Sequence, residues 1–187
     1  MPLYTTRDDI FTAVNSQVSP DTEYLITTRI DNDDAVSQDF VEAVQSRFGR
    51  QRFGFVNLTR GYVHALRTHP VLALLRVVGL ADSPTTIRTH QGSNPFISLI
   101  EKRNDDGFRT VLMDTHWRLG EYGPIEQVTD EYYWIQVVHD RNVVNQHNLR
   151  PHRLALNALY RTREGTPISF ARFKLGARPE ASGASSR

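Results

Sequence analysis

An apolar, β-branched segment that stops abruptly at a cluster of acids constrains the fold of this chain more than any other feature. Residues 24–30 read YLITTRI, and three carboxylates follow within four positions, at Asp31, Asp33 and Asp34. The segment is too apolar for a half-exposed strand, so we predict a buried one. Segments with helical spacing of apolar residues precede and follow it. The order helix, buried strand, acidic loop, helix predicts an α/β domain with a parallel sheet.

Both flanking helices carry start signals as well as helical spacing. Thr6 precedes Asp9 by three residues, which is a capping-box pattern for a helix over residues 6–18. Ser37 is the candidate cap of the second helix, over residues 37–48. The apolar positions expected to share a face are Ile10, Phe11, Val14 and Val18 in the first helix, and Phe40, Val41, Val44 and Phe48 in the second.

Further elements are expected from apolar and β-branched runs along the rest of the chain. Residues 94–102 and 108–117 are predicted to pair as a hairpin around a turn at residues 103–107. Residues 71–80 fit either a helix or a strand. The remaining expected elements are strands over residues 52–58 and 132–139 and a short helix over residues 152–161.

The composition excludes several classes of protein. The chain has 187 residues, enough for one domain with a sizeable core, and it contains no cysteine. A disulfide framework, a thiolate nucleophile and a cysteine-ligated zinc site are therefore excluded. The sequence has no apolar run of membrane-spanning length and no secretory signal segment, so we expect a cytoplasmic protein. No nucleic-acid partner is expected.

The charge is unevenly distributed along the chain. From Asn148 onward, eight Lys or Arg residues stand against two acids. A solvated surface explains this basic region, and peripheral contact with an anionic membrane face or a phosphate-bearing ligand is the alternative. Residues 176–187 have almost nothing to bury and are expected to form a disordered tail.

The acid cluster has the chemistry of a site for a hard divalent cation. In an extended chain, residues two apart point the same way, so Asp31 and Asp33 would share a face at the carboxyl end of a strand. Paired carboxylates suit Mg²⁺ or Mn²⁺. Capping of the following helix is the competing explanation and stays open. A calcium loop is excluded because Val36 stands where such a loop needs glycine.

The segment TTRIDNDDAVSQDFV, residues 27–41, resembles the metal-binding segment of bacterial putative rhamnosyltransferases. SNPFISLIE at residues 93–101, His116 and WIQVVHDRNVVN at residues 134–145 agree in order, so the resemblance spans roughly residues 8–146. It implies a glycosyltransferase of the GT-A fold, with a mixed sheet flanked by helices. It also implies transfer of a sugar from a nucleotide-diphosphate donor to a glycan or glycolipid acceptor, with Mn²⁺ or Mg²⁺ held by the acidic motif.

The resemblance assigns roles to several residues of the acidic segment. Asp31 and Asp33 occupy the two acidic positions of the motif, and Asp34 matches a further acid that often accompanies them. Asn32, between them, lies near the sugar end of such sites. Arg29 stands two residues before Asp31 and is expected to pair with the acids or with phosphate, a structural ion pair being the alternative.

A metal ligand and a base are expected later in the chain. His139 ends a predicted strand, where in related folds a late histidine completes the metal shell; a hydrogen-bonded histidine at a strand end is the alternative. An inverting transfer needs a base to deprotonate the acceptor hydroxyl, and Glu101 is the preferred candidate, with a solvated charge as the alternative. The other candidates are Asp114, His116, Asp130 and Glu131, and the aromatic residues that could stack on sugars are Trp117, Tyr132, Tyr133 and Trp134.

One departure from the family pattern concerns the start of the chain. A GT-A domain normally begins with several βα units that build the nucleotide pocket, whereas here one helix precedes the acidic strand. We therefore expect residues 1–175 to form a partial, N-terminally truncated GT-A-like domain. A catalytically silent sugar- or nucleotide-binding module is the main alternative to an active transferase, and a metal-dependent phosphohydrolase is a weaker one.

Overall fold

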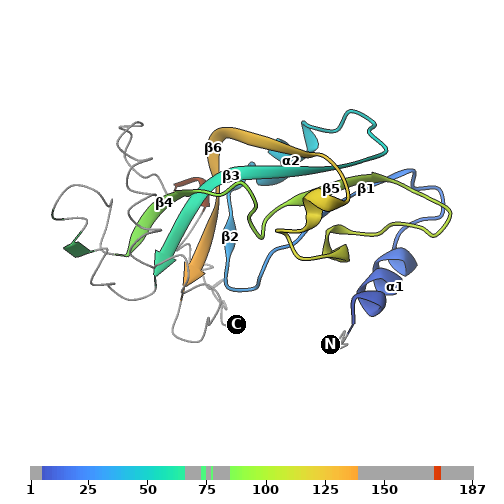
Figure 1. The fold of residues 1–187 in the computed structure, drawn as a ribbon, viewed down its shortest axis with the longest axis horizontal. Coiled ribbons are helices and arrows are strands. Elements are labelled where there is room, and N and C mark those ends of the chain that lie inside the picture. Colours follow the sequence, from blue (N-terminus) through green and yellow to red (C-terminus); the bar gives the residue numbers. More distant parts are fainter. Residues whose placement is uncertain (1–5, 66–72, 75–76, 78–84, 139–170, 174–187) are drawn as a thin grey trace, which may run out of the picture.

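The structure is a computed structural model that describes residues 6–65, 73–74, 77, 85–138 and 171–173. The described residues form a mixed α/β arrangement in which a six-stranded sheet dominates and helices are few (Figure 1). None of the described helices is long and apolar enough to cross a bilayer. The elements are α1 (Arg7–Gln17), β1 (Tyr24–Thr28), β2 (Ala35–Val36), α2 (Phe40–Gln45), β3 (Phe53–Ala65), β4 (Thr86–His90), β5 (Ser98–Lys102), η1 (Val111–Met113), η2 (Leu119–Glu121), β6 (Ile125–Val138) and η4 (Ala171–Phe173).

The sheet is mixed, as the family resemblance implies, and this corrects the parallel sheet predicted from the order of elements. Its strand order is β1-β5-β3-β6-β2, and β4 pairs with β3 beyond the end of β5. Among the described strands, only β3 and β6 pair in parallel, and the other pairings are antiparallel. The two long parallel strands therefore form the centre of the sheet, and the strands paired beside them run in the opposite direction (Figure 1).

The centre of the core is a tryptophan packed on a glycine. The buried Trp134 of β6 stacks on Phe96, with 4.9 Å between ring centroids, and its Nε1 donates to the carbonyl oxygen of Leu58 at 2.7 Å. The indole lies so close to Gly61 of β3 that an added Cβ there would approach Cδ2 of Trp134 to 2.1 Å. The strand predicted at residues 52–58 is observed as β3, and it continues as far as Ala65, which includes Gly61. Glycine at position 61 makes room for the ring that fills the core.

Strand β1 forms where the sequence predicts it, but in a different environment. It lies at the end of the strand order and pairs with β5. All five of its residues are only partly buried, so the prediction of a fully buried strand is wrong. An edge strand has no neighbour on its second side to complete its burial, which explains the difference.

The predicted hairpin of residues 94–102 with 108–117 does not form. Residues 98–102 are strand β5, but the second segment contains the 3₁₀ turn η1. The backbone N–H groups of Arg109 and Thr110 donate to the carboxylate of Glu101, at 3.0 and 2.8 Å. The N–H of Val111 donates to Oγ1 of Thr27 at 2.8 Å. These donors are used by side chains, so they do not form a strand ladder.

Helix α1 starts as predicted. The side chain of Thr6 accepts from the backbone N–H of Asp9, and the side chain of Asp9 accepts from the N–H of Thr6, which completes a capping box. The helix has no fully buried residue. It contacts the later chain through Asn15, whose amide donates to the carbonyl oxygen of Phe108 and accepts from the N–H of the same residue, at 2.8 and 2.9 Å.

Helix α2 is shorter than predicted, and Ser37 is not its cap. The helix starts at Phe40 with Asp39 at the N-cap position. Ser37 instead donates its N–H to the carbonyl oxygen of Tyr133 at 2.8 Å, which extends the pairing of β2 with β6. Phe40 and Val44 are buried as expected, whereas Val41 and Phe48 of the predicted apolar face are exposed.

Several predicted features lie outside the described residues. They are His139, most of residues 71–80, the helix over residues 152–161 and the tail at residues 176–187.

Candidate functional site

The acidic segment is a loop that joins two strands on opposite edges of the sheet. It follows β1, the first strand in the order, and leads into β2, the last. The N–H of Asp34 donates to the carbonyl oxygen of Asp31 at 3.2 Å, which closes a turn over residues 31–34. Asn32 within this turn is exposed, and Asp31, Asp33 and Asp34 are partly buried. The loop therefore places three acidic residues just beyond the carboxyl end of β1, in a turn rather than in the extended conformation that the prediction of a shared face assumed.

Asp34 joins this loop to the end of β6. Its Oδ1 accepts a 2.8 Å hydrogen bond from the backbone N–H of Val137. Its Oδ2 is buried and has no hydrogen-bond partner among the described residues. Burial, helped by the negative charges of Asp33 and Asp31, raises the pKa of the Asp34 carboxyl to about 6, although the hydrogen bond from Val137 and the charge of Arg29 lower it. A buried carboxylate oxygen without a partner needs a proton or a cation.

Arg29 forms an ion pair with Asp31, the first acid of the turn. Its Nε donates to Oδ1 of Asp31 at 3.1 Å and its NH2 to Oδ2 at 3.3 Å. Both side chains are well exposed to solvent, at 42% and 39%. This bidentate pair is one of the arrangements predicted for Arg29, and its exposure makes it a weak ion pair that another anion or cation can displace.

A second segment, residues 111–122, reaches the acidic loop from a distant part of the chain. The N–H of Val111 bonds to Thr27 in β1, as described above, two residues before Arg29. The imidazole of His116 is largely desolvated, which lowers its pKa, and the nearby charges of Arg29 and Asp31 act on it in opposite directions. His116 therefore lies within electrostatic range of Arg29 and Asp31.

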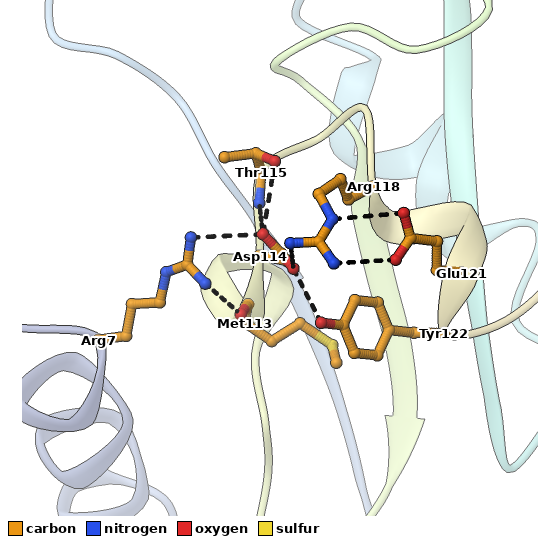
Figure 2. Close-up of polar contacts among 7 residues, drawn as sticks. All are labelled: Arg7, Met113, Asp114, Thr115, Arg118, Glu121 and Tyr122. Carbon is orange, nitrogen blue, oxygen red and sulfur yellow. Dashed lines mark hydrogen bonds and ion pairs between the residues drawn. The ribbon is translucent and has the colours of Figure 1, made fainter.

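The carboxylate of Asp114 organises this segment (Figure 2). Its Oδ1 accepts from the N–H of Thr115 at 2.7 Å, and its Oδ2 accepts from the hydroxyl of Tyr122 at 2.8 Å. The guanidinium groups of Arg7 and Arg118 both lie 3.4 Å from it. The hydrogen bonds from Thr115 and Tyr122 hold the pKa of Asp114 below its usual range. A carboxylate with a lowered pKa is a poor base. The contacts of Asp114 therefore serve to hold residues 113–122 and Arg7 together.

Glu101 is also held by the backbone. Its side chain is 1% exposed, and both of its carboxylate oxygens accept the N–H bonds of residues 109 and 110. Burial raises the pKa of Glu101, and the two hydrogen bonds oppose that rise. The function of this carboxylate in the structure is to fix the turn that leads into η1. Its assignment as the base stays a prediction.

The structure thus gathers part of the predicted site. Arg29 and Asp31 pair, Asp34 lies in the same turn, and His116 interacts with them electrostatically. Within the described part of the chain, no group of three histidine or acidic residues is arranged to hold a metal ion. Sequence reasoning missed the hydrogen bond from Val137 to Asp34 and the contact of Arg7 with Asp114, because each joins positions more than a hundred residues apart.

Comparison with known proteins adds one finding. A family model described as "Putative rhamnosyl transferase" matches residues 2–151. No curated protein and no solved structure matches the chain.

Proposed function

Since the chain belongs to the putative rhamnosyl transferase family, we propose that it transfers a sugar from a nucleoside-diphosphate donor to a glycan or glycolipid acceptor. The GT-A arrangement of the sheet is part of this proposal. The observation that carries it is the turn at residues 31–34, which places three acidic residues beyond the end of β1 in the segment that resembles the family's metal-binding motif.

The residues of the turn suit a divalent cation. Carboxylate oxygens are the donors that Mg²⁺ and Mn²⁺ prefer, and Oδ2 of Asp34 is a buried oxygen without a partner. Asp31 and Asp33 would hold the ion, with His139 as a further ligand. When bound, such an ion neutralises charge on the diphosphate leaving group.

Arg29 has a role in this proposal that its geometry supports. In the structure it holds the carboxylate of Asp31 through two hydrogen bonds and keeps it in one orientation. Because the pair is exposed, the guanidinium can turn to a phosphate oxygen when the donor arrives. Asn32 and Asp34 flank the same turn and would contact the donor from it.

A catalytically silent sugar- or nucleotide-binding protein is the second candidate function. It is favoured by the burial of Glu101, whose two oxygens are both engaged by backbone donors. In this case the donor would bind at the acidic turn but would not react. A cytoplasmic location and a peripheral contact with an anionic membrane face remain predictions under both candidates.

The proposal is tested by measuring the release of nucleoside diphosphate from a panel of nucleoside-diphosphate sugars. The panel includes the nucleoside-diphosphate derivative of rhamnose. We expect release that requires Mn²⁺ or Mg²⁺ and that Asp31→Asn reduces by at least about a hundredfold. Asp8→Asn, which changes an exposed acid in the first turn of α1, is the matched control and should retain activity. Donor binding without release in the wild type would support the silent module instead.

A further inference from the structure

The segment at residues 111–122, which is hydrogen-bonded to β1, carries two exposed aromatic rings. Trp117 is 64% exposed and Tyr122 is 43% exposed. The other tryptophan of the chain, Trp134, is fully buried in the core. A largely exposed tryptophan is unusual, because its large apolar surface normally packs inside a protein. Packing within the fold therefore does not account for the exposure of Trp117.

The segment that carries these rings is held firmly on its inner side. Oγ of Ser93 donates to the carbonyl oxygen of His116 at 2.7 Å, and the ring of His116 meets Trp117 edge to face, with 4.7 Å between ring centroids. Arg118 is fixed by Glu121, and the hydroxyl of Tyr122 by Asp114 (Figure 2). Trp117 and Tyr122 are thus exposed on a segment that these contacts hold in place. Such a rigid aromatic surface loses little entropy when a ligand covers it.

The position of the segment gives the ligand. Val111, six residues before Trp117, donates its N–H to Oγ1 of Thr27 near the end of β1, and the charges of Arg29 and Asp31 act on the imidazole of His116. The exposed indole of Trp117 therefore follows His116 directly in the sequence, and His116 interacts electrostatically with the proposed donor site. A pyranose ring offers a face of C–H groups to an aromatic ring and a rim of hydroxyls to neighbouring charged groups such as Arg118 and Glu121.

We propose that Trp117 is a stacking platform for a pyranose ring of the acceptor, with Tyr122 as a second aromatic contact on the same segment. This inference rests on the proposed function in one respect, the assignment of the ring to the acceptor. The acceptor sugar would then contact residues 111–122, and the donor would contact residues 29–34.

Sugar binding by the full chain tests this proposal without any turnover. The probes are methyl α-rhamnopyranoside and methyl α-glucopyranoside, observed by saturation transfer to their C–H protons and by tryptophan emission. Because Trp134 is buried, a change in emission on binding reports on Trp117. We expect saturable binding of at least one glycoside, weakened about tenfold or more in Trp117→Ala and partly restored in Trp117→Tyr.

Phe48→Ala is the matched control, because Phe48 is an exposed ring that contacts Tyr24 at the other end of β1. It should leave glycoside binding unchanged. No saturable binding by the wild type, or equal binding by wild type and Trp117→Ala, would overturn the platform. Asp31→Asn separates the two proposals: loss of donor turnover with intact glycoside binding supports both, whereas absence of donor turnover in the wild type with Trp117-dependent glycoside binding contradicts only the transferase.

Discussion

The backbone N–H of Val137 donates a 2.8 Å hydrogen bond to Oδ1 of Asp34, across 103 positions of the sequence. This bond ties the acidic turn to the last residues of β6, the strand that His139 follows directly in the sequence. It also leaves the second oxygen of Asp34 buried without a partner. Asp34, which stands beside the two acidic positions of the motif, therefore fixes the loop to β6.

Asp34 should make stability depend on pH in a direction opposite to that of a salt-bridged acid. Burial raises its pKa from 3.8 to about 6, so the folded chain holds this proton more tightly than the unfolded chain does. Its contribution to the free energy of unfolding is complete below about pH 4 and is lost as the pH rises through 6. Because the carboxyl is partly exposed, we expect a loss of only about 1 kcal/mol.

Urea denaturation between pH 4 and 8 in the presence of a chelator measures this effect. Asp34→Asn keeps an oxygen that can accept from Val137 but cannot ionise, so its stability curve should be flatter over this interval. The same slope in both proteins would show that Asp34 does not titrate in the folded state as described.

Gly61→Ala should destabilise the protein severely. The added Cβ would lie 2.1 Å from Cδ2 of Trp134, and the indole cannot retreat easily because its Nε1 is bonded to Leu58. Overpacking of this kind costs about 1–3 kcal/mol or more, and we expect the upper end of that range or failure to fold. Gly92→Ala is the control, since no atom lies within 4 Å of its added Cβ. Equal stability of the two variants in chemical denaturation would contradict this packing.

Glu101→Gln separates a structural carboxylate from a base. The amide nitrogen of glutamine would face a backbone N–H in place of an accepting oxygen, so one buried donor would lose its partner. We expect the free energy of unfolding to fall by about 1–3 kcal/mol. Glu42→Gln, on the exposed side of α2, should change it little. A stable Glu101→Gln protein that has lost only turnover would instead support Glu101 as the base.

Asp114→Ala should loosen the segment from residue 113 to residue 122. The substitution removes the acceptor for the N–H of Thr115 and for the hydroxyl of Tyr122. Hydrogen exchange at the Thr115 amide should therefore become faster, with the core of β3 unaffected. Asp106→Ala, in the exposed turn before Gly107, is the control. Unchanged exchange at Thr115 would show that the segment is held by other contacts.

Local features of the fold could be predicted from the sequence, but the pairing of strands could not. Thr6 and Asp9 marked the start of α1 correctly because a capping box involves residues three apart. The partner of β1 is β5, more than seventy residues later, and nothing in the apolar pattern of residues 24–30 encodes that pairing or its antiparallel direction.

The segment after β5 shows why a strand-like sequence can fail to form a strand. Residues 108–117 are rich in strand-forming types, yet Thr110 has a φ angle of 67° and the neighbouring N–H groups bond to side chains of Glu101 and Thr27. These acceptors come from other parts of the fold, so the outcome depends on tertiary structure. The same reason explains why the hydrogen bond from Val137 to Asp34 and the electrostatic interaction of Asp31 with His116 could not be predicted from the sequence.

Binding of Mn²⁺ at the acidic turn tests the central claim most directly. Calorimetry on the wild type, Asp33→Asn and the control Asp8→Asn, each with a nucleoside diphosphate present, compares the three affinities. We predict that Mn²⁺ binds the wild type and Asp8→Asn equally and binds Asp33→Asn at least about tenfold more weakly, because a carboxylate ligand has been lost. Equal affinity of Asp33→Asn and the wild type would contradict the assignment of the metal, and with it the donor, to residues 31–34.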